Sequence, residues 1–396
     1  MLNFTYEYKL IPTKSQIAEI ERTLGICKSV WNYALAERKD WVNFRKCLVN
    51  ACSLEKEYII PADTKFPNYH VQAKALTKAR ANNSELKSVN AQLLQQVLRT
   101  LDRAWEDIRK RNFGFPRFKN AVRMRSFIFP QFKSNPVKGN KIKLPQLGWV
   151  KFRKSREIPE GFQVKQARVV RRATGYYLML SIQLDVNVVN PIPHGHALGI
   201  DIGLDKYLAT SDGELINRPK FFNSLHRKLK LLQRRLRNKQ KRSNNRFRLN
   251  RRIAKIHEKI AATRKDFHFK LAHKLCEQAG MIFVEDIDFK SWAKGMLRKH
   301  TLDASFGQFF QILQYVAWKT DTYFLEVDKN YTSQICPNCE TKGGKKLLSE
   351  RTHNCPACGY TTNRDVAAAQ VIRNKGLVAV GQPVNQNACG DVSSGG

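Results

Sequence analysis

Two short cysteine pairs place the tightest constraint on how this chain can fold. Cys336 and Cys339 form one Cys-Pro-x-Cys pair, and Cys355 and Cys358 form a second after an interval of fifteen residues. This spacing is typical of a zinc ribbon, in which two tight turns present four thiolates to one tetrahedral ion. Because all four positions are cysteine, no coordination site is left open. We therefore expect one structural Zn²⁺, with His353 as the only nearby residue that could substitute for a cysteine.

The remaining cysteines are scattered. Five of the nine fall outside the two pairs, at positions Cys27, Cys47, Cys52, Cys276 and Cys389. A disulfide framework is a property of small secreted chains with paired cysteines, so this distribution excludes one. The N-terminal residues lack the basic and apolar regions of a secretory signal, and no run of eighteen apolar residues occurs. We expect a cytoplasmic protein, associated with the nucleoid in a prokaryote.

The charge of the chain predicts a polyanionic partner. Seventy lysines and arginines against 33 acids give a formal net charge of +37, which favours nucleic acid over an anionic membrane surface. Residues 227–274 carry 19 basic residues against Glu258 and Asp266. Apolar residues at helical spacing lie on both sides of a polar turn at 243–245, so we predict a basic helical hairpin. Its expected nucleic-acid contacts are Lys228, Arg234, Arg235, Arg237, Lys241, Arg242, Arg251 and Arg252.

Residues 113–184 form a second basic segment. Short apolar runs separated by Pro and Gly predict a small β-barrel or sandwich here. Basic residues alternate with phenylalanines, a pattern suited to phosphate neutralisation combined with base stacking. The expected contacts are Arg117, Lys119 and Arg125. The alternative is a solvated basic face over an aromatic core.

Residues 12–112 are expected to be mostly helical. Apolar residues recur every three or four positions from Ile17 to Leu35 and again from Val89 to Ile108. Such stripes indicate core packing between helices rather than a cofactor site. Before them, residues 4–11 alternate as a short strand.

Three carboxylates occupy the ends of predicted elements in the second half of the chain. Asp201 interrupts an apolar strand at 197–204, Glu285 ends a second apolar strand, and Asp365 lies in the first turn of a helix. From its strand alone, Asp201 could equally be structural. Together the three follow a β-β-α-β-α-β-α order, the ribonuclease H plan. In such a site a few carboxylates hold two Mg²⁺ ions, which activate water and stabilise the leaving oxygen of a phosphodiester.

The order of these motifs resembles the TnpB family of insertion-sequence proteins, also called OrfB. The matching motifs are Gly199-Ile-Asp201-Ile-Gly203, Val284-Glu285-Asp286, Tyr331-Thr-Ser-Gln-Ile-Cys336, Arg364-Asp365, the two cysteine pairs, Thr23-Leu-Gly-Ile-Cys-Lys-Ser-Val-Trp-Asn32 and Phe113-Gly-Phe-Pro-Arg-Phe-Lys119. The resemblance implies an RNA-guided DNA endonuclease of a transposon, related to type V CRISPR effectors. It implies that Asp201, Glu285 and Asp365 are catalytic and bind two Mg²⁺ ions. The implied partners are a guide RNA derived from the transposon end and double-stranded target DNA carrying a short flanking motif.

The resemblance also implies a multidomain α+β fold. Its parts are an RNase H-like (RuvC) nuclease domain with a zinc-ribbon insertion, a helical recognition domain and a wedge-type β-barrel. The expected boundaries are 1–11 for the first strand of the wedge barrel, 12–112 for the recognition domain, 113–190 for the wedge barrel, 191–330 for the nuclease domain with the basic hairpin 227–274, 331–360 for the zinc ribbon, 361–380 for the C-terminal nuclease helix and 381–396 for a disordered tail.

Three positions depart from the family pattern. Asn363 and Ala367 stand where many members have Asp and Asn, and Glu340 stands where Gly commonly follows the first cysteine pair. A catalytically silent RNA-guided DNA-binding protein is one alternative, although such relatives would be expected to lack one of the carboxylates. A miniature type V CRISPR effector is another, and the short chain favours the transposon form over it. A transposase that joins DNA ends by itself would not explain so large a basic surface.

Overall fold

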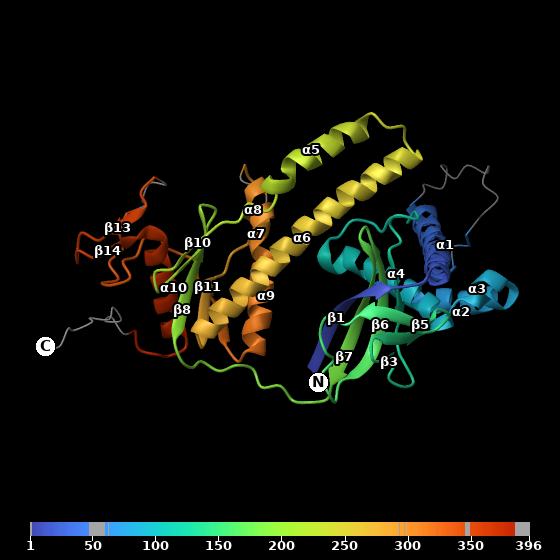
Figure 1. The fold of residues 1–396 in the computed structure, drawn as a ribbon, viewed down its shortest axis with the longest axis horizontal. Helices are drawn as coiled ribbons and strands as arrows, with labels where there is room; N and C mark the ends of the chain where they lie inside the picture. Colours follow the sequence, from blue (N-terminus) through green and yellow to red (C-terminus); the bar gives the residue numbers. More distant parts are fainter. Residues whose placement is uncertain are drawn as a thin grey trace. The chain divides into compact units, whose positions relative to one another are not determined.

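The computed structural model describes residues 2–46, 60–61, 63–292, 294–296, 298–344 and 349–384 (Figure 1). They divide into two compact units, Met1–Val188 and Val189–Gly396. Both units mix helices with sheets, so the predicted multidomain α+β class is confirmed. Cys47, Cys52, Cys389 and most of the predicted tail lie outside the described residues.

The described residues of the first unit form four helices and a seven-stranded antiparallel sheet. Its elements are β1 (Leu2–Ile11), α1 (Lys14–Lys46), α2 (Tyr69–Asn82), α3 (Ser84–Ser88), α4 (Ala91–Arg111), β2 (Ser126–Phe129), β3 (Val137–Lys138), β4 (Lys141–Leu144), β5 (Gly148–Arg153), β6 (Gln163–Arg172) and β7 (Gly175–Leu184). The strand order is β2-β6-β7-β1-β5-β4-β3, which leaves β2 and β3 at the edges. The predicted strand at the N-terminus is confirmed, because β1 pairs with both β5 and β7. Pairing between the edge strands is not recorded among the described residues, so closure into a barrel stays a prediction.

Helices α1 and α4 pack against this sheet through the two predicted apolar stripes. Trp31 and Leu35 of α1 and Leu93 and Leu101 of α4 are buried in one cluster with the inward residues of the strands. Asn90 caps α4 by accepting hydrogen bonds from the backbone N–H groups of the first turn, which satisfies donors that a helix start leaves unpaired.

A buried polar link also joins the helices of the first unit. The fully buried guanidinium of Arg38 on α1 lies 2.9 Å from Asp102 on α4. It also donates to Gln72 on α2. A buried cation needs this compensation, since an unpaired charge in a protein interior costs several kcal/mol.

The second unit is built on a five-stranded sheet. Its elements are β8 (Ala197–Ile202), β9 (Lys206–Thr210), β10 (Leu215–Asn217), α5 (Asn223–Arg237), α6 (Asn244–Gln278), β11 (Met281–Glu285), α7 (Phe289–Trp292), α8 (Arg298–Ala304), α9 (Phe306–Lys319), β12 (Tyr323–Val327), β13 (Thr352–Asn354), β14 (Thr361–Asn363) and α10 (Arg364–Ala379). The sheet order is β10-β9-β8-β11-β12. Strands β8, β11 and β12 are parallel, and β9 and β10 extend the sheet as an antiparallel meander. The short strand β10 was not predicted.

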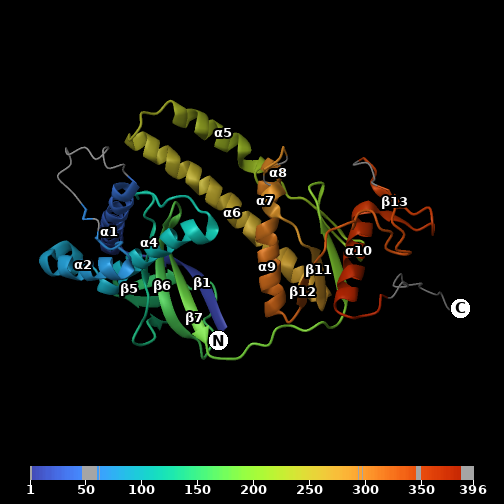
Figure 2. The same ribbon diagram turned by 180° about the vertical axis from the view of Figure 1, so that it is seen from behind.

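Helices cover both faces of this sheet (Figures 1 and 2). Side chains alternate along a strand, so Leu198 and Ile200 of β8 point to one face, where they pack with α6 and α9. On the other face, Phe283 of β11 packs with Ile372 and Leu377 of α10. The central strands are therefore buried on both sides, as their continuous apolar sequence predicts.

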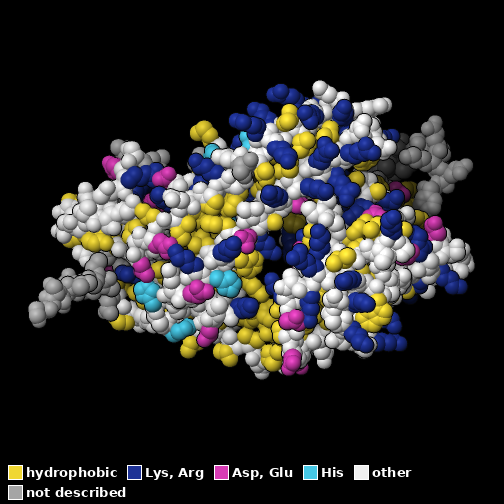
Figure 3. Space-filling model, in the orientation of Figure 1, with side chains coloured by type: hydrophobic (Ala, Val, Ile, Leu, Met, Phe, Trp, Pro, Cys, Tyr) yellow, Lys and Arg dark blue, Asp and Glu magenta, His cyan; other side chains and the backbone are white. Residues whose placement is uncertain are grey.

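Helices α5 and α6 form the predicted basic hairpin. Leu229 and Leu232 of α5 pack against Ile256 and Ile260 of α6. Ser243 caps α6 by accepting a hydrogen bond from the backbone of Arg246. Lysines and arginines gather over this hairpin in the space-filling view (Figure 3).

Candidate catalytic and zinc sites

The parallel pairing of β8 and β11 brings two of the three predicted carboxylates together. Val284 pairs with Ile200, so the next step of the same register aligns Glu285 with Asp201. Neighbouring strands lie about 4.8 Å apart, and aligned residues point to the same face of the sheet. Both carboxylates therefore lie at one end of the central strands, on the face that α10 covers.

Helix α10 brings the third carboxylate to this end of the sheet. Asp365 lies in its first turn, on the same helical stripe as Ala369 and Gly376. A side chain at Gly199 would clash with the backbone of Ala369, and one at Gly376 would clash with the Phe283 ring, so the helix approaches the sheet closely. One helical turn is about 5.4 Å and two strand residues span about 6.6 Å. Asp365 lies one helical turn before this contact, and its negative charge acts on Asp201.

The pKa of Asp201 reflects the nearby carboxylates. Its pKa is raised well above the ordinary value, first by burial and then by the negative charges of Glu285 and Asp365. Arg364 opposes the shift. The pKa of Glu285 is also raised by burial. Buried carboxylates that repel one another favour either a proton or a cation.

Residues around Glu285 hold its carboxylate in place. The hydroxyl of Thr332 donates a hydrogen bond to Oε1 of Glu285, and Thr332 is 6% exposed. Burial raises the pKa of Glu285, and the Thr332 hydrogen bond and the ammonium groups of Lys375 and Lys329 oppose part of that rise. Lys375 also donates to the backbone oxygens of Asp328 and Asn330, at 2.9 and 2.6 Å. Thr332 lies within the motif Tyr331-Thr-Ser-Gln-Ile-Cys336, which predicts no role for it, and no spacing rule pairs it with Glu285.

The two departures near Asp365 have structural roles. Asn363 is the N-cap of α10, and its side chain accepts a hydrogen bond from the backbone of Asp365 at 2.9 Å. Asp and Asn are similarly effective caps, so Asn363 preserves the start of this helix. Ala367 is 3% exposed and is one of the buried residues of α10.

The carboxylates fit the ligand preference of Mg²⁺, which is bound by oxygen atoms. Their negative charges are compensated only in part by Arg364, Lys329 and Lys375. Among the described residues, the cysteine cluster is the only group of three or more His, Cys, Asp or Glu side chains placed closely enough to hold a metal ion. The carboxylates therefore converge more loosely than the thiols.

The four predicted cysteines form that cluster. Their sulfurs lie within 4.8 Å of one another, and His353 is not part of the group. Cys336 and Cys358 sulfurs are 3.7 Å apart and those of Cys339 and Cys355 are 3.5 Å apart. Four sulfurs in a tetrahedron at about 2.3 Å from one zinc ion would be about 3.8 Å apart. The observed separations fit a tetrahedral zinc site and are too long for disulfides.

The thiols of this cluster do not share one acidity. Hydrogen bonds with Thr341 lower the pKa of Cys339 to about 6, whereas burial raises the pKa of Cys336 to about 12. Zinc is bound by thiolates, so loading this site must release protons.

The third departure lies in the first cysteine turn. The backbone N–H of Glu340 donates to the Cys336 oxygen at 3.0 Å, and that of Gly359 donates to the Cys355 oxygen at 2.9 Å. The two residues are therefore equivalent in the two turns. Both are in the left-handed region, with φ of 58° at Glu340 and 71° at Gly359. This conformation costs a residue with a Cβ free energy that glycine does not pay.

The predicted nucleic-acid contacts are exposed with one exception. Arg117, Arg125 and the eight residues of the α5–α6 hairpin all have exposed side chains. Between the two helices lies a hollow of about 580 Å³, lined by Arg235, Lys239, Arg248 and Arg252. Lys119 is the exception, because it is half-buried and its ammonium lies 3.4 Å from the centre of the Trp31 ring.

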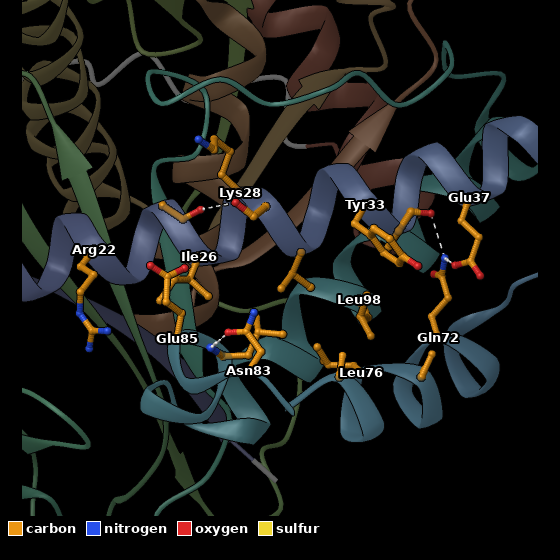
Figure 4. A pocket seen from close by; sticks show the side chains of 17 residues that line it. Arg22, Ile26, Lys28, Tyr33, Glu37, Gln72, Leu76, Asn83, Glu85 and Leu98 are labelled. Atoms are coloured by element: carbon orange, nitrogen blue, oxygen red, sulfur yellow. Dashed lines mark hydrogen bonds between the residues drawn. The ribbon is translucent and has the colours of Figure 1, made fainter. Parts of the chain in front are cut away.

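A cavity of about 590 Å³ lies in the first unit (Figure 4). Arg22, Tyr33 and Glu37 project into it from α1, opposite Gln72 and Leu76 of α2. None of the three carboxylates lines it. This cavity is therefore separate from the candidate catalytic site.

Among the described helices, none combines the length and apolar character needed to cross a membrane.

Family models match three parts of the chain. A model described as "Probable transposase" matches residues 181–295, one described as "Cas12f1-like, TNB domain" matches 306–372, and one described as "Helix-turn-helix domain" matches 1–47. In the structure, the described residues of the last match form one strand and one helix, β1 and α1. The first two matches contain Asp201, Glu285, Asp365 and the four cysteines.

Curated relatives align with almost the whole chain. "Putative RNA-guided DNA endonuclease InsQ" of Escherichia coli (strain K12) is 29% identical over 410 residues, covering 99% of this chain and 95% of the relative. "Putative RNA-guided DNA endonuclease" of Streptomyces pristinaespiralis is 28% identical, covering 98% and 90%. "TnpB-like protein L79" of Acanthamoeba polyphaga mimivirus is 29% identical over 33% of this chain and 26% of its own length.

Among solved structures, a Cas12f1–sgRNA–target DNA complex matches with a TM-score of 0.34 and 18% identity, covering 95% of this chain and 100% of that chain. The family assignment rests on the sequence matches. With the cysteine pairs and the three carboxylates in the same order along the chain, these matches identify it as a member of the TnpB family of insertion-sequence proteins.

Proposed function

We propose that this protein is an RNA-guided DNA endonuclease of a transposon. It hydrolyses phosphodiesters of target DNA after a guide RNA has paired beside a short flanking motif. The observation that carries the proposal is the convergence of Asp201, Glu285 and Asp365 at one end of the sheet in the second unit. The printed names of the two full-length relatives support the same activity.

In this proposal the second unit is an RNase H-like (RuvC) nuclease domain with a zinc-ribbon insertion. Its antiparallel meander continued by parallel strands, with helices on both faces, supports that assignment. The first unit would contain the helical recognition domain and the wedge-type β-barrel. The domain boundaries remain those expected from the sequence.

The three carboxylates would hold two Mg²⁺ ions. When bound, the ions would supply Lewis acidity at the scissile phosphodiester and make water a stronger acid. Asp201 and Glu285 are fixed by the paired strands, and Asp365 by the capped first turn of α10. Thr332 orients Glu285 through its hydrogen bond. Preorganised ligands of this kind avoid the cost of rearranging charged groups during the reaction.

The zinc ion would be structural in this scheme. All four ligands come from the protein, so no position is open for substrate or water. Zinc would fix the residues between β12 and α10, which include Thr332. In this way the ribbon would support the catalytic site without taking part in the chemistry.

The basic surfaces would bind the guide RNA and the target DNA. The exposed residues of the α5–α6 hairpin, with Arg117 and Arg125, would neutralise backbone phosphates. Sequence choice would pass to base pairing, while the protein reads backbone shape and a short duplex motif.

A cleavage assay on the purified RNA complex tests the catalytic part of the proposal. Asp201→Asn, Glu285→Gln and Asp365→Asn should each lower the rate by orders of magnitude while the co-purified RNA is retained. Asp212→Asn is a matched control, since this exposed carboxylate pairs with His196 at 2.8 Å and should leave the rate unchanged. Full cleavage by Asp201→Asn would overturn the assignment.

A further inference from the structure

A small cavity in the first unit contains two cations without acidic partners. It has a volume of about 110 Å³ and is lined by Lys119 and Arg168, with Gln96, Thr100, Ser126 and Trp31. Pockets for drug-sized ligands are typically about 300–1,000 Å³, so this one is sized for a single small group. Thr100, one of the lining residues, is exposed.

Lys119 is held rigidly at this cavity. Its backbone N–H donates to Asn32 at 2.8 Å, and its carbonyl accepts from the Asn32 amide at 2.8 Å. The ammonium lies over the Trp31 ring. Among the described residues, no carboxylate lies within salt-bridge distance of this ammonium. Burial lowers the pKa of Lys119 to about 8, as expected of a cation that has lost water without gaining an anion.

Of the other polar side chains at the cavity, Thr100 donates to the Gln96 carbonyl at 2.7 Å, and three lack a partner among the described residues. Arg168 is half-buried on β6, and no ion pair or hydrogen bond of its guanidinium to a described residue is recorded. The same holds for the side-chain amide of Gln96 and the hydroxyl of Ser126. Two cations and two neutral donors therefore line one cavity, a set that matches the needs of an anion with several oxygens.

We propose that this cavity binds one phosphate group of a bound nucleic acid strand. The proposal rests on the proposed function and deepens it by assigning a defined phosphate site to the first unit. Trp31 forms one wall of the cavity, and Lys119 and Arg168 supply the charge. Lys119 therefore differs from the exposed basic residues, because it is preorganised for one phosphate rather than attracted to the backbone in general.

Salt-dependent binding by the full-length protein tests the site. The probes are a 30-nucleotide polyuridine RNA and a 30-base-pair DNA duplex of arbitrary sequence, because the phosphodiester could come from either. Each lost contact should lower the slope of log K against log salt by about 0.7 for single strands or 0.9 for duplex. When salt is raised from 50 to 200 mM, the affinity of the unmodified protein falls by some factor. For Lys119→Gln or Arg168→Gln that factor should be about threefold smaller. Lys119→Arg should keep the slope.

A matched control and a stability measurement separate binding from folding. Lys110→Gln removes a cation that is already paired with Glu106 at 3.0 Å, and its slope should stay unchanged. In the protein freed of nucleic acid, Lys119→Met should keep or raise the melting temperature, because a desolvated charge is removed. The probe whose slope falls identifies the source of the phosphate.

Unchanged slopes for both pocket variants on both probes would overturn the site, as would an equal change in Lys110→Gln. A melting temperature lowered by Lys119→Met would make Lys119 structural and contradict the proposal. In either case guide-dependent cleavage would continue to support the nuclease function, so the two proposals fail separately.

Discussion

The left-handed conformation of Glu340 in the first cysteine turn leads to a testable prediction, and the second cysteine turn provides its control. Glu340 has a φ of 58°, and its equivalent in the other turn, Gly359, has a φ of 71°. A left-handed residue with a Cβ costs about 1–2 kcal/mol. Glycine removes that cost but adds about 0.4–1 kcal/mol of chain entropy in the unfolded state. Glu340→Gly should therefore stabilise the zinc-bound ribbon by about 0.5–1 kcal/mol.

This gain should appear as tighter zinc binding, because metal binding and folding of such a ribbon are coupled. The expected decrease in the apparent dissociation constant is about two- to fivefold. Competition with a chromophoric chelator measures it. Glu340→Ala is the control for charge, because it removes the carboxylate and keeps the Cβ, and it should give little of the gain. Gly359→Ala should weaken zinc binding. Equal effects of Glu340→Gly and Glu340→Ala would refute the backbone explanation.

Other predictions concern the carboxylates and the zinc ribbon. The raised pKa of Asp201 means that the metal-free native state binds a proton more tightly than the unfolded state does. The stability of that native state should therefore fall as pH rises above the ordinary value of 3.8. Thermal unfolding with a chelator should show this fall, and Asp201→Asn should reduce it. Thr332→Val should slow cleavage by about 10–100-fold, the usual effect of removing a group that orients a metal ligand, while Thr332→Ser retains most of the rate; an unchanged rate for Thr332→Val would exclude the positioning role. Cys355→Ser should abolish stoichiometric zinc in elemental analysis of the full-length protein, and one zinc retained per chain would contradict a four-cysteine site.

Much of the candidate site was predictable because its chemistry is carried by local patterns. The cysteine spacing predicted the ribbon, and the acid at the end of the apolar strand predicted the position of Glu285. Asp365 was predicted in the first turn of a helix, where it lies in α10. The contacts that bring these residues together are long-range, however. The register that aligns Glu285 with Asp201 depends on strands separated by the whole basic hairpin.

Some residues have roles that the sequence did not predict, because those roles arise from long-range contacts. Thr332 reaches Glu285 across 47 residues of chain, and its own surroundings contain no signal of this role. Lys119 was predicted as an ordinary phosphate contact, but contact with Trp31 makes it half-buried. Arg38 and Asp102 form an ion pair 64 residues apart within helices whose stripes predicted only apolar packing. Burial of a charged side chain is decided by its tertiary neighbours, which a local pattern does not contain.

Exchange of the guide sequence tests the central claim most directly. The protein is purified with its RNA, the segment that pairs with target DNA is replaced, and the products from a library of DNA duplexes are sequenced. If specificity lies in base pairing, cleavage should move to the sequence that matches the new guide while the flanking motif stays the same. If the cleaved sequence stays the same after the exchange, specificity lies in protein side chains and the RNA-guided account is wrong.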